Sequence, residues 1–247
     1  RAIQKLALVV DLGGGTSDFT VIRLSNQYIH KPDRTSDILA NTGVRIGGND
    51  FDKDLSLAAI MPELGYKSTY GAKNLEVPLR HYYDLSEWSK VNMLYTTKII
   101  SQTRQLLFES HDKSRFKRLL QVLEEETGHA LLAITEETKI ALTHADSYDT
   151  PFAFLEEGLS TNVTRAQFDA AVQLQIQKIA KAALECLIQA GISQEDIELV
   201  ILTGGTTEVP AVQAEFKRLF PNADIAEENK LSSVGLGLAY DSQNKFK

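Results

Sequence analysis

The feature that most constrains the fold of this 247-residue chain is the stretch Lys5–Leu24, KLALVVDLGGGTSDFTVIRL. An apolar run ends at Asp11, three glycines and Thr16 follow, and a second apolar, β-branched run continues to Leu24. This pattern predicts two strands joined by a tight turn. Glycine lets the backbone of such a turn approach a ligand closely, and consecutive amide N–H groups can form a concave anion nest.

Asp11 stands beside this predicted nest, where its carboxylate would repel a bare phosphate group. Its position is explained if a divalent cation lies between the two, directly or through water. Thr16 adds a hydroxyl donor. Two interpretations of the stretch stay open with equal weight: a magnesium–nucleotide phosphate site on a β-hairpin, and a glycine-rich turn that binds no ligand.

A strand and a glycine turn recur near the other end of the chain. Residues 198–202 predict a short buried strand, and residues 203–207 (TGGTT) a glycine turn. Residues 38–46 predict a third strand after the first hairpin, so the sheet is expected to be mixed rather than parallel. Strand, glycine turn and helix at both ends predict one α/β subdomain, which is split by an inserted subdomain.

The segment between the two glycine turns is predicted to be mostly helical. Residues 51–61 have apolar side chains at helical spacing, and Asn49 or Asp50 is a suitable N-cap. Most of residues 90–145 follow a helical pattern as well. The other predicted elements are strands at 150–155, 159–163 and 223–226, a helix at 165–190 capped by Thr164, and helices at 209–220 and 232–240.

Composition excludes several classes of protein. The net charge of −7 argues against binding to nucleic acid or to an anionic membrane surface. Cys186 is the only cysteine, so no internal disulfide can form, and a reducing, cytoplasmic location is expected. No apolar run reaches membrane-spanning length. The chain begins at Arg1 and enters a core strand within a few residues, so we expect a fragment that lacks an upstream lobe.

Three segments, in this order, resemble motifs of the actin-like ATPase superfamily. Residues 11–16 (DLGGGT) resemble its phosphate-2 motif, and residues 202–210 (LTGGTTEVP) resemble its adenosine motif. Residues 45–52 (RIGGNDFD) are similar to the segment between them in seventy-kilodalton heat-shock chaperones. Taken together with residues 61–65 (MPELG), the sequence of residues 45–52 looks most like that of the YegD-type chaperone-like proteins.

The resemblance implies a ribonuclease-H-like lobe with a mixed sheet and an inserted, mostly helical α+β subdomain. This chain would be the second lobe of its parent, with a core subdomain at 1–46 and 164–247 and an outer subdomain at 47–163. The first phosphate motif and a lysine of the chaperones belong to the first lobe. The isolated chain would then hold half of a nucleotide site and be inactive alone.

The resemblance also implies roles for single residues in binding ATP or ADP with Mg²⁺. Asp11 would be the catalytic residue, acting through water on magnesium or on the attacking water. One face of a helix would cover the adenosine. Its residues Glu136, Lys139 and Thr143 are three and four positions apart, which by helical spacing places them on the same face. The residues implied to contact the nucleotide are Gly13, Gly14, Gly15 and Thr16 at the β- and γ-phosphates, Gly48 on the ligand side of its turn, Gly204, Gly205 and Thr206 at the ribose and base, and Glu136, Lys139 and Thr143 over the adenosine.

Three positions depart from the chaperone pattern. Ile140 and Glu208 stand where the chaperones have the two arginines that flank the adenine, and Asn49 stands where they have an acid. The phosphate contacts are thus expected to be preserved, while the contacts to the base are altered.

The resemblance implies a chaperone-like protein that binds ATP and hydrolyses it slowly, with its first lobe and protein clients as partners. One alternative is an actin-like, filament-forming cytoskeletal protein, although the long helical insertion at 62–130 would be large for that class. Another is a degenerate lobe that binds partners and no nucleotide, which the substitutions at Ile140 and Glu208 motivate.

Overall fold

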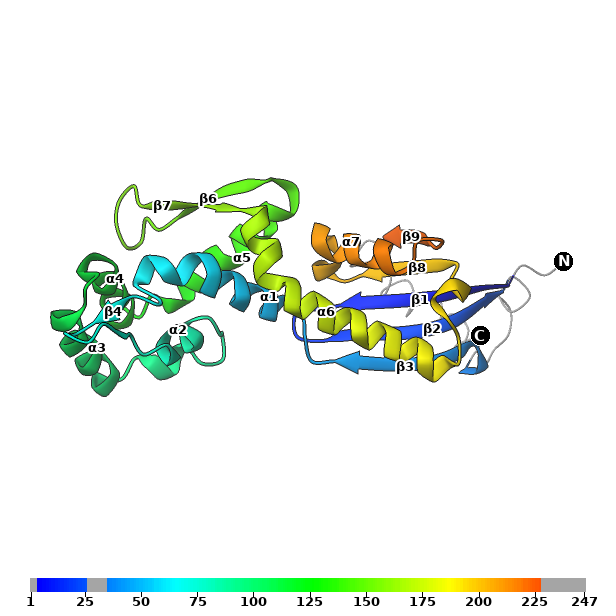
Figure 1. Ribbon diagram of the computed structural model, residues 1–247, viewed down its shortest axis with the longest axis horizontal. Coiled ribbons are helices and arrows are strands. Elements are labelled where there is room, and N and C mark those ends of the chain that lie inside the picture. The colour runs from blue at the N-terminus through cyan, green and yellow to red at the C-terminus, as the bar shows by residue number, and fades with distance from the viewer. Residues whose placement is uncertain (1–3, 26–34, 228–247) are drawn as a thin grey trace, which may run out of the picture. The chain divides into compact units, whose positions relative to one another are not determined.

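The computed structural model describes residues 4–25 and 35–227 (Figure 1). The chain forms two compact units. We call Arg1–Gly48 with Leu174–Lys247 the sheet unit, and Asn49–Gln173 the inserted unit. The predicted subdomain boundaries at 46/47 and 163/164 stay a prediction, since a compact unit is not by itself an independently folding domain.

The sheet unit is built on a mixed five-stranded sheet with the strand order β3-β2-β1-β8-β9. The hairpin strands pair antiparallel, as do β2 and β3, whereas β1–β8 and β8–β9 are parallel. The mixed α/β architecture expected from the sequence is thereby confirmed. The strands are β1 (Gln4–Leu12), β2 (Ser17–Ser25), β3 (Ile38–Val44), β8 (Leu199–Thr203) and β9 (Asp224–Glu227).

Helix α6 (Arg165–Ala190) is divided between the two units, with residues 165–173 in the inserted unit, and it begins there at a capping box, in which Thr164 and Gln167 exchange hydrogen bonds. It ends at Gly191, which has a φ of 70° and acts as the left-handed C-terminal residue. Within the sheet unit, Cys186 Sγ lies 3.5 Å from the carbonyl oxygen of Phe19 on β2, and both residues are fully buried. This part of α6 therefore packs on the sheet, and Cys186 has a structural place in that core.

The other described elements of the sheet unit are short. Helix α7 (Pro210–Leu219) has its proline in the first turn, where the missing N–H costs no hydrogen bond. Within the described part of this unit, 3-10 turns lie at Thr35–Asp37, Gln194–Asp196 and Gly205–Glu208. Among the described residues, no helix is both long and apolar enough to cross a membrane.

The inserted unit is mostly helical around its own apolar core, which includes Tyr82, Phe116 and Phe152. Its helices are α1 (Gly48–Leu55), which starts at the last residue of the sheet unit, α2 (Arg80–Leu85), α3 (Thr97–Glu109), α4 (Lys113–Glu124) and α5 (Gly128–His144). Between these helices lie a short π-helix at Ser56–Ile60 and 3-10 turns at Met61–Leu64 and Val91–Leu94. Its strands are β4 (Thr69–Tyr70), β5 (Leu75–Glu76), β6 (Ser147–Pro151) and β7 (Ser160–Thr164).

Helix α1 starts earlier than the sequence predicts, and one predicted helix lies outside the described residues. Helix α1 begins at Gly48, so the N-cap predicted at Asn49 or Asp50 was wrong. The amide of Gly48 bonds to the first glycine hairpin instead, and this tertiary bond starts the helix earlier than side-chain capping would. The helix predicted at 232–240 lies outside the described residues.

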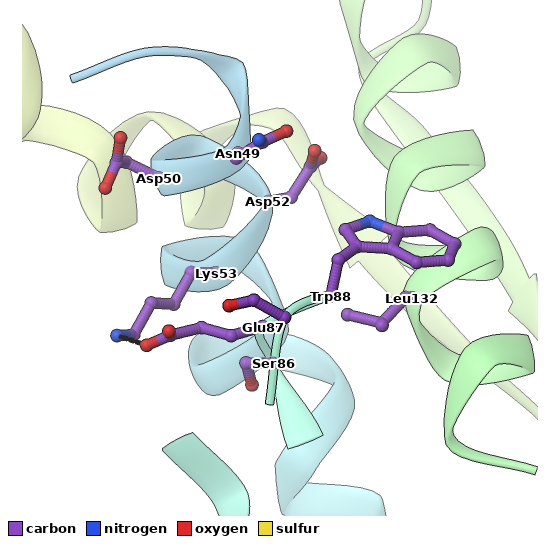
Figure 2. Close-up of a pocket in the computed structure, with 9 residues that line it drawn as sticks. Asn49, Asp50, Asp52, Lys53, Ser86, Glu87, Trp88 and Leu132 are labelled. Carbon is purple, nitrogen blue, oxygen red and sulfur yellow. Dashed lines mark hydrogen bonds and ion pairs between the residues drawn. The ribbon is translucent and has the colours of Figure 1, made fainter. Parts of the chain in front are cut away.

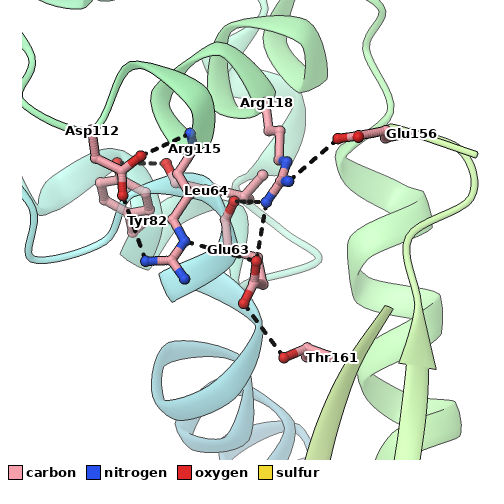
Figure 3. A network of polar contacts seen from close by, with 8 residues as sticks. All are labelled: Glu63, Leu64, Tyr82, Asp112, Arg115, Arg118, Glu156 and Thr161. Atoms are coloured by element: carbon pink, nitrogen blue, oxygen red, sulfur yellow. Dashed lines mark hydrogen bonds and ion pairs between the residues drawn. The ribbon is translucent and has the colours of Figure 1, made fainter. Parts of the chain in front are cut away.

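A polar network holds the Met61–Leu64 turn against α4 (Figure 3). Arg118 on α4 donates to the Glu63 carboxylate at 3.0 Å and to the Glu63 carbonyl at 3.3 Å. Its other Nη reaches Glu156 at 3.3 Å, and Thr161 on β7 donates to Glu63 at 3.4 Å. Only 15% of the Arg118 side chain and 17% of the Glu63 side chain are exposed. The pair therefore joins three parts of the inserted unit in poorly screened surroundings.

Replacing Arg118 by methionine should lower the free energy of unfolding by about 2 kcal/mol, because the Glu63 carboxylate loses its main partner. Fully buried pairs lose about 3–5 kcal/mol on such a change, and this pair keeps some solvent. Urea unfolding measures the loss. The control is Arg104→Met, which breaks an ion pair to Glu124 whose arginine is 57% exposed and should cost less than about 1 kcal/mol. Equal losses in both variants would contradict a structural role for the network.

Candidate functional site

The first glycine hairpin is an open turn at the end of two central strands. Gly13 N–H donates to the Thr16 carbonyl at 2.9 Å and closes the loop between β1 and β2. Gly14, Gly15 and Thr16 are exposed. The amide N–H groups of Gly14 and Gly15 make no hydrogen bond to any residue in the described ranges. These two donors are thus free to bind an anion, as the nest predicted from the sequence requires.

Two distant segments meet this hairpin at the carbonyl oxygen of Gly13. The amide of Gly48 donates to it at 3.0 Å, and the Thr206 hydroxyl donates to it at 3.2 Å across 193 residues of sequence. The structure therefore brings together Gly13, Gly48 and Thr206. The Gly48 and Thr206 donors are used inside the protein here, and both residues are buried, so they hold the loops in place.

The second glycine turn approaches the first so closely that a side chain could not fit between them. Gly204 has a φ of 86°, and a Cβ atom there would lie 2.4 Å from the Leu12 carbonyl oxygen and 2.8 Å from Asp11 Oδ1. A Cβ atom on Gly47 would lie 2.6 Å from the Gly13 carbonyl oxygen. Gly205, which opens the next turn, is exposed. The backbones of both glycine turns thus form one compact cluster around Asp11.

A second carboxylate faces Asp11, and the sequence reasoning missed it. Asp11 pairs with Asp18 in the register of β1 and β2, so the two side chains lie on the same face of the sheet. Both residues are exposed, and the Thr16 hydroxyl donates to Asp18 at 3.3 Å. Like charges directly opposite each other destabilise a strand pair, and a bound cation would relieve this repulsion. The four-residue loop 13–16 was the signal, because it fixes which residues stand opposite.

These two carboxylates fit the chemistry of a magnesium site that is only partly protein. In the described part of the chain, no group of three or more His, Cys, Asp or Glu residues could hold a metal ion. Magnesium usually keeps several waters and takes one or two carboxylates together with phosphate oxygens of the substrate. The donor set at the hairpin fits that mode of binding and does not fit a closed protein cage.

The face implied to cover adenosine lies on α5 in the inserted unit. Lys139 Nζ lies 2.9 Å from both carboxylate oxygens of Asp52, and the Thr143 hydroxyl donates to the Lys139 carbonyl at 3.1 Å. Glu136 is exposed, as is Ile140 at 54%. The Lys139 ammonium group is therefore already engaged, by a partner on α1 that the spacing of α5 alone could not reveal.

The surroundings of Asp52 disfavour its charged form. Burial raises the pKa of the Asp52 carboxyl, Lys139 opposes that rise, and the negative charge of Glu136 adds to it. Glu136, Lys139 and Asp52 thus form one electrostatic group in the inserted unit. Whether Glu136, Lys139 and Thr143 contact a nucleotide stays a prediction.

The chain matches one family model and several curated relatives. The family model "Hsp70 protein" matches residues 107–242, which is more than half of the chain. The chain is 26% identical over 239 residues to the chaperone protein dnaK of Cyanidioschyzon merolae, covering 94% of this chain and 30% of that protein. It is 27% identical over 236 residues to the mitochondrial heat shock 70 kDa protein of Solanum tuberosum, covering 96% and 27%. The chaperone protein HscA homolog of Aliivibrio salmonicida is 25% identical over 237 residues, covering 96% and 28%.

The chain thus spans less than a third of the length of these curated relatives. Its mixed sheet agrees with the ribonuclease-H-like fold of the actin-like ATPases, to which the nucleotide-binding domain of Hsp70 proteins belongs. The family match and the architecture agree with the motif resemblance, and the chain belongs to the Hsp70 family.

Proposed function

We propose that this chain is the second lobe of an ATP-binding, chaperone-like protein whose first lobe is supplied by the same parent chain. The observation that carries the proposal is the open glycine hairpin, where two free amide donors stand beside the paired carboxylates of Asp11 and Asp18. Backbone N–H groups that can bind an anion lie here beside carboxylates that can bind a cation. This combination suits a magnesium–phosphate group better than either a bare anion or a bare cation.

In the proposed mechanism, the amides of Gly14 and Gly15 bind the β- and γ-phosphates. The Thr16 hydroxyl turns from Asp18 to a phosphate oxygen. Magnesium, when bound, neutralises charge on the phosphates, and Asp11 and Asp18 would hold it through water. Asp11 would also orient the attacking water. Phosphoryl transfer needs little more than this positioning and charge neutralisation, so a slow hydrolysis that depends on the first lobe is expected.

The finer parts of the proposal rest on the resemblance. The adenosine is proposed to lie against Glu136, Lys139 and Thr143 of α5, while Gly204 and Gly205 approach the ribose and base. The subdomain limits at 46/47 and 163/164, the YegD-type affiliation, the cytoplasmic location and binding of protein clients belong to the same proposal. Nucleotide would bias closure of the two lobes, a hinge-type switch.

A second candidate function is a partner-binding lobe that takes up no nucleotide. Two observations favour it. Ile140 is 54% exposed where the resemblance expects an arginine beside the adenine. Lys139, expected at the adenosine, is paired with Asp52. Both changes weaken recognition of the base and leave the glycine hairpin untouched.

The test is magnesium-dependent ATP binding and turnover by the parent protein with both lobes, compared with its Asp11→Asn variant. We expect the variant to bind magnesium–ATP about 10- to 100-fold more weakly, the usual cost of losing a carboxylate that orients a metal's ligands. Without magnesium, the two proteins should bind ATP alike. The control is Asp224→Asn, an exposed carboxylate on β9 that pairs loosely with Lys5 at 3.9 Å. Absence of nucleotide binding by the unaltered parent would reject the proposal and favour the partner-binding lobe.

A further inference from the structure

Charged side chains that line a pocket of ≈ 270 Å³ in the inserted unit are already engaged (Figure 2). Glu87 binds Lys53 there, and Asp52 lies 2.9 Å from Lys139, so these charges balance and select no ligand. The glycine hairpin of the sheet unit differs, because two amide N–H groups of the loop 13–16 have no partner in the described ranges. These donors can act on an anion only if the loop holds them in a fixed direction.

The peptide unit between Gly13 and Gly14 carries one of these donors. Its carbonyl oxygen accepts hydrogen bonds from the Gly48 amide at 3.0 Å and from the Thr206 hydroxyl at 3.2 Å, whereas its N–H is free of partners in the described residues. A peptide unit is planar and trans, so its C=O and N–H bonds point in opposite directions. Gly48 and Thr206 are buried, and Gly14 is exposed. Two buried anchors on the carbonyl oxygen therefore direct the Gly14 N–H toward the open side of the loop.

This peptide unit needs its anchors because of the sequence around it. Residues 13–15 are consecutive glycines, whose backbone reaches regions of φ and ψ that other residues avoid. A rotation of the peptide plane would replace the outward N–H by the carbonyl oxygen, which repels an anion. The two hydrogen bonds occupy both lone pairs of the Gly13 carbonyl oxygen and oppose that rotation. They also polarise the peptide unit, which strengthens its N–H as a donor.

Thr206 supplies its anchor from the second glycine turn, 193 residues along the chain from Gly13. The residue is 7% exposed, and its hydroxyl proton is donated to Gly13. We infer that Thr206 is a positioning residue for phosphate: its hydroxyl fixes the Gly13–Gly14 peptide so that the Gly14 N–H binds a phosphate oxygen. This role replaces the contact to the ribose and base that the motif resemblance implies for Thr206. The inference rests on the proposed function, since it concerns the same phosphate site.

Two ligands separate these roles in the parent protein with both lobes. One is magnesium–ATP, and the other is magnesium–tripolyphosphate, which has the phosphates without the nucleoside. Thr206→Val keeps the shape of the side chain and removes the hydroxyl. In titration calorimetry it should weaken binding of both ligands by the same factor, about 3- to 10-fold, as for the loss of one hydrogen bond. Thr206→Ser keeps the hydroxyl and should bind both ligands within about twofold of the unaltered protein.

Weaker binding of ATP alone would identify a contact to the nucleoside, and unchanged binding of both ligands would show that the hydroxyl positions nothing. Either result overturns the inference while the proposed function stands. If the unaltered parent binds neither ligand, the proposed function and the inference both fail. The control is Thr42→Val, which removes a hydroxyl bonded to the Ala182 carbonyl at 3.4 Å and should leave both affinities unchanged. An equal loss in this control would attribute the effect to general stability and overturn the inference.

A nuclear magnetic resonance experiment on the chain alone tests the anchor without nucleotide. With ¹³C,¹⁵N-labelled glycine, an HNCO spectrum shows only glycines that follow another glycine, which are Gly14, Gly15, Gly48 and Gly205. The Gly14 signal reports the Gly13 carbonyl carbon, which hydrogen bonding deshields by polarising the carbonyl group. Thr206→Val should therefore move this signal to lower carbonyl frequency, whereas Thr206→Ser should leave it in place. Thr206→Ala gives the same comparison if the valine variant unfolds, and an unmoved Gly14 signal would overturn the inference.

Discussion

Replacing Gly204 by alanine is expected to lower the free energy of unfolding by about 3–5 kcal/mol. Two costs add. Its φ of 86° with a ψ of 151° is a region that residues with a Cβ atom hardly visit. The new Cβ atom would also lie 2.4 Å from the Leu12 carbonyl oxygen and 2.8 Å from Asp11 Oδ1, so backbone must move. The same shift displaces Asp11, and magnesium–ATP binding by the parent protein should fall with it.

Chemical unfolding of the isolated chain measures the loss, and Gly158→Ala is the matched control. Gly158 has a φ of 75°, yet a Cβ atom there meets no atom within 4 Å. Its replacement therefore reports the cost of the backbone conformation alone, about 1–2 kcal/mol. If the two variants lose the same stability, the close approach of the two glycine turns would not be a constraint on the fold.

The second large effect is expected for Lys139→Met, which should lower the free energy of unfolding by about 3–5 kcal/mol at neutral pH. The reason is Asp52, which is 8% exposed and would be left charged without its ammonium partner. Lys181→Met is the control, because Lys181 forms an exposed helix pair with Glu185 at 3.7 Å and should cost less than about 0.5 kcal/mol. Thermal or chemical unfolding of both variants gives the comparison.

The dependence on pH distinguishes this electrostatic cause from lost packing. The pKa of Asp52 is raised in the folded protein, so the folded state binds its proton more tightly than the unfolded state does. The contribution of Asp52 to the free energy of unfolding therefore rises as the pH falls from above the raised pKa toward the ordinary value of 3.8. Lys139 lowers the pKa of Asp52, so its loss raises that pKa further. The loss in free energy of unfolding that Lys139→Met causes should therefore become smaller as the pH is lowered. The double change Lys139→Met with Asp52→Leu should recover most of the stability at neutral pH, and a deficit unaffected by pH or by the second change would point to packing.

Local patterns predicted the elements that depend on neighbouring residues. The hairpin around Gly13–Thr16 followed from two apolar runs, the second of them β-branched, on either side of a glycine turn. Helix α6 followed from the cap at Thr164. These elements are specified within a few residues, so a single sequence contains the information.

What the sequence could not predict depends on contacts between distant segments. The bond from Thr206 to Gly13 spans 193 residues, and the pair Lys139–Asp52 spans 87. No spacing rule connects such positions. The start of α1 at Gly48 was missed for the same reason, because a tertiary bond to Gly13 outweighed the capping preference of Asn49. Asp18 could have been found, since the loop length alone sets it opposite Asp11.

The parallel pairing of β1 with β8 has a consequence for synthesis on the ribosome. Strand β1 takes β2 as its partner on one side as soon as the hairpin emerges, whereas its other edge waits for residues 199–203. At about 5–20 residues per second, that wait lasts roughly 10–40 s. An unpaired apolar edge is a template for pairing with other chains. One edge of β1, the strand that carries Asp11, therefore stays unpaired while the inserted unit is synthesised. During that time, aggregation competes with folding.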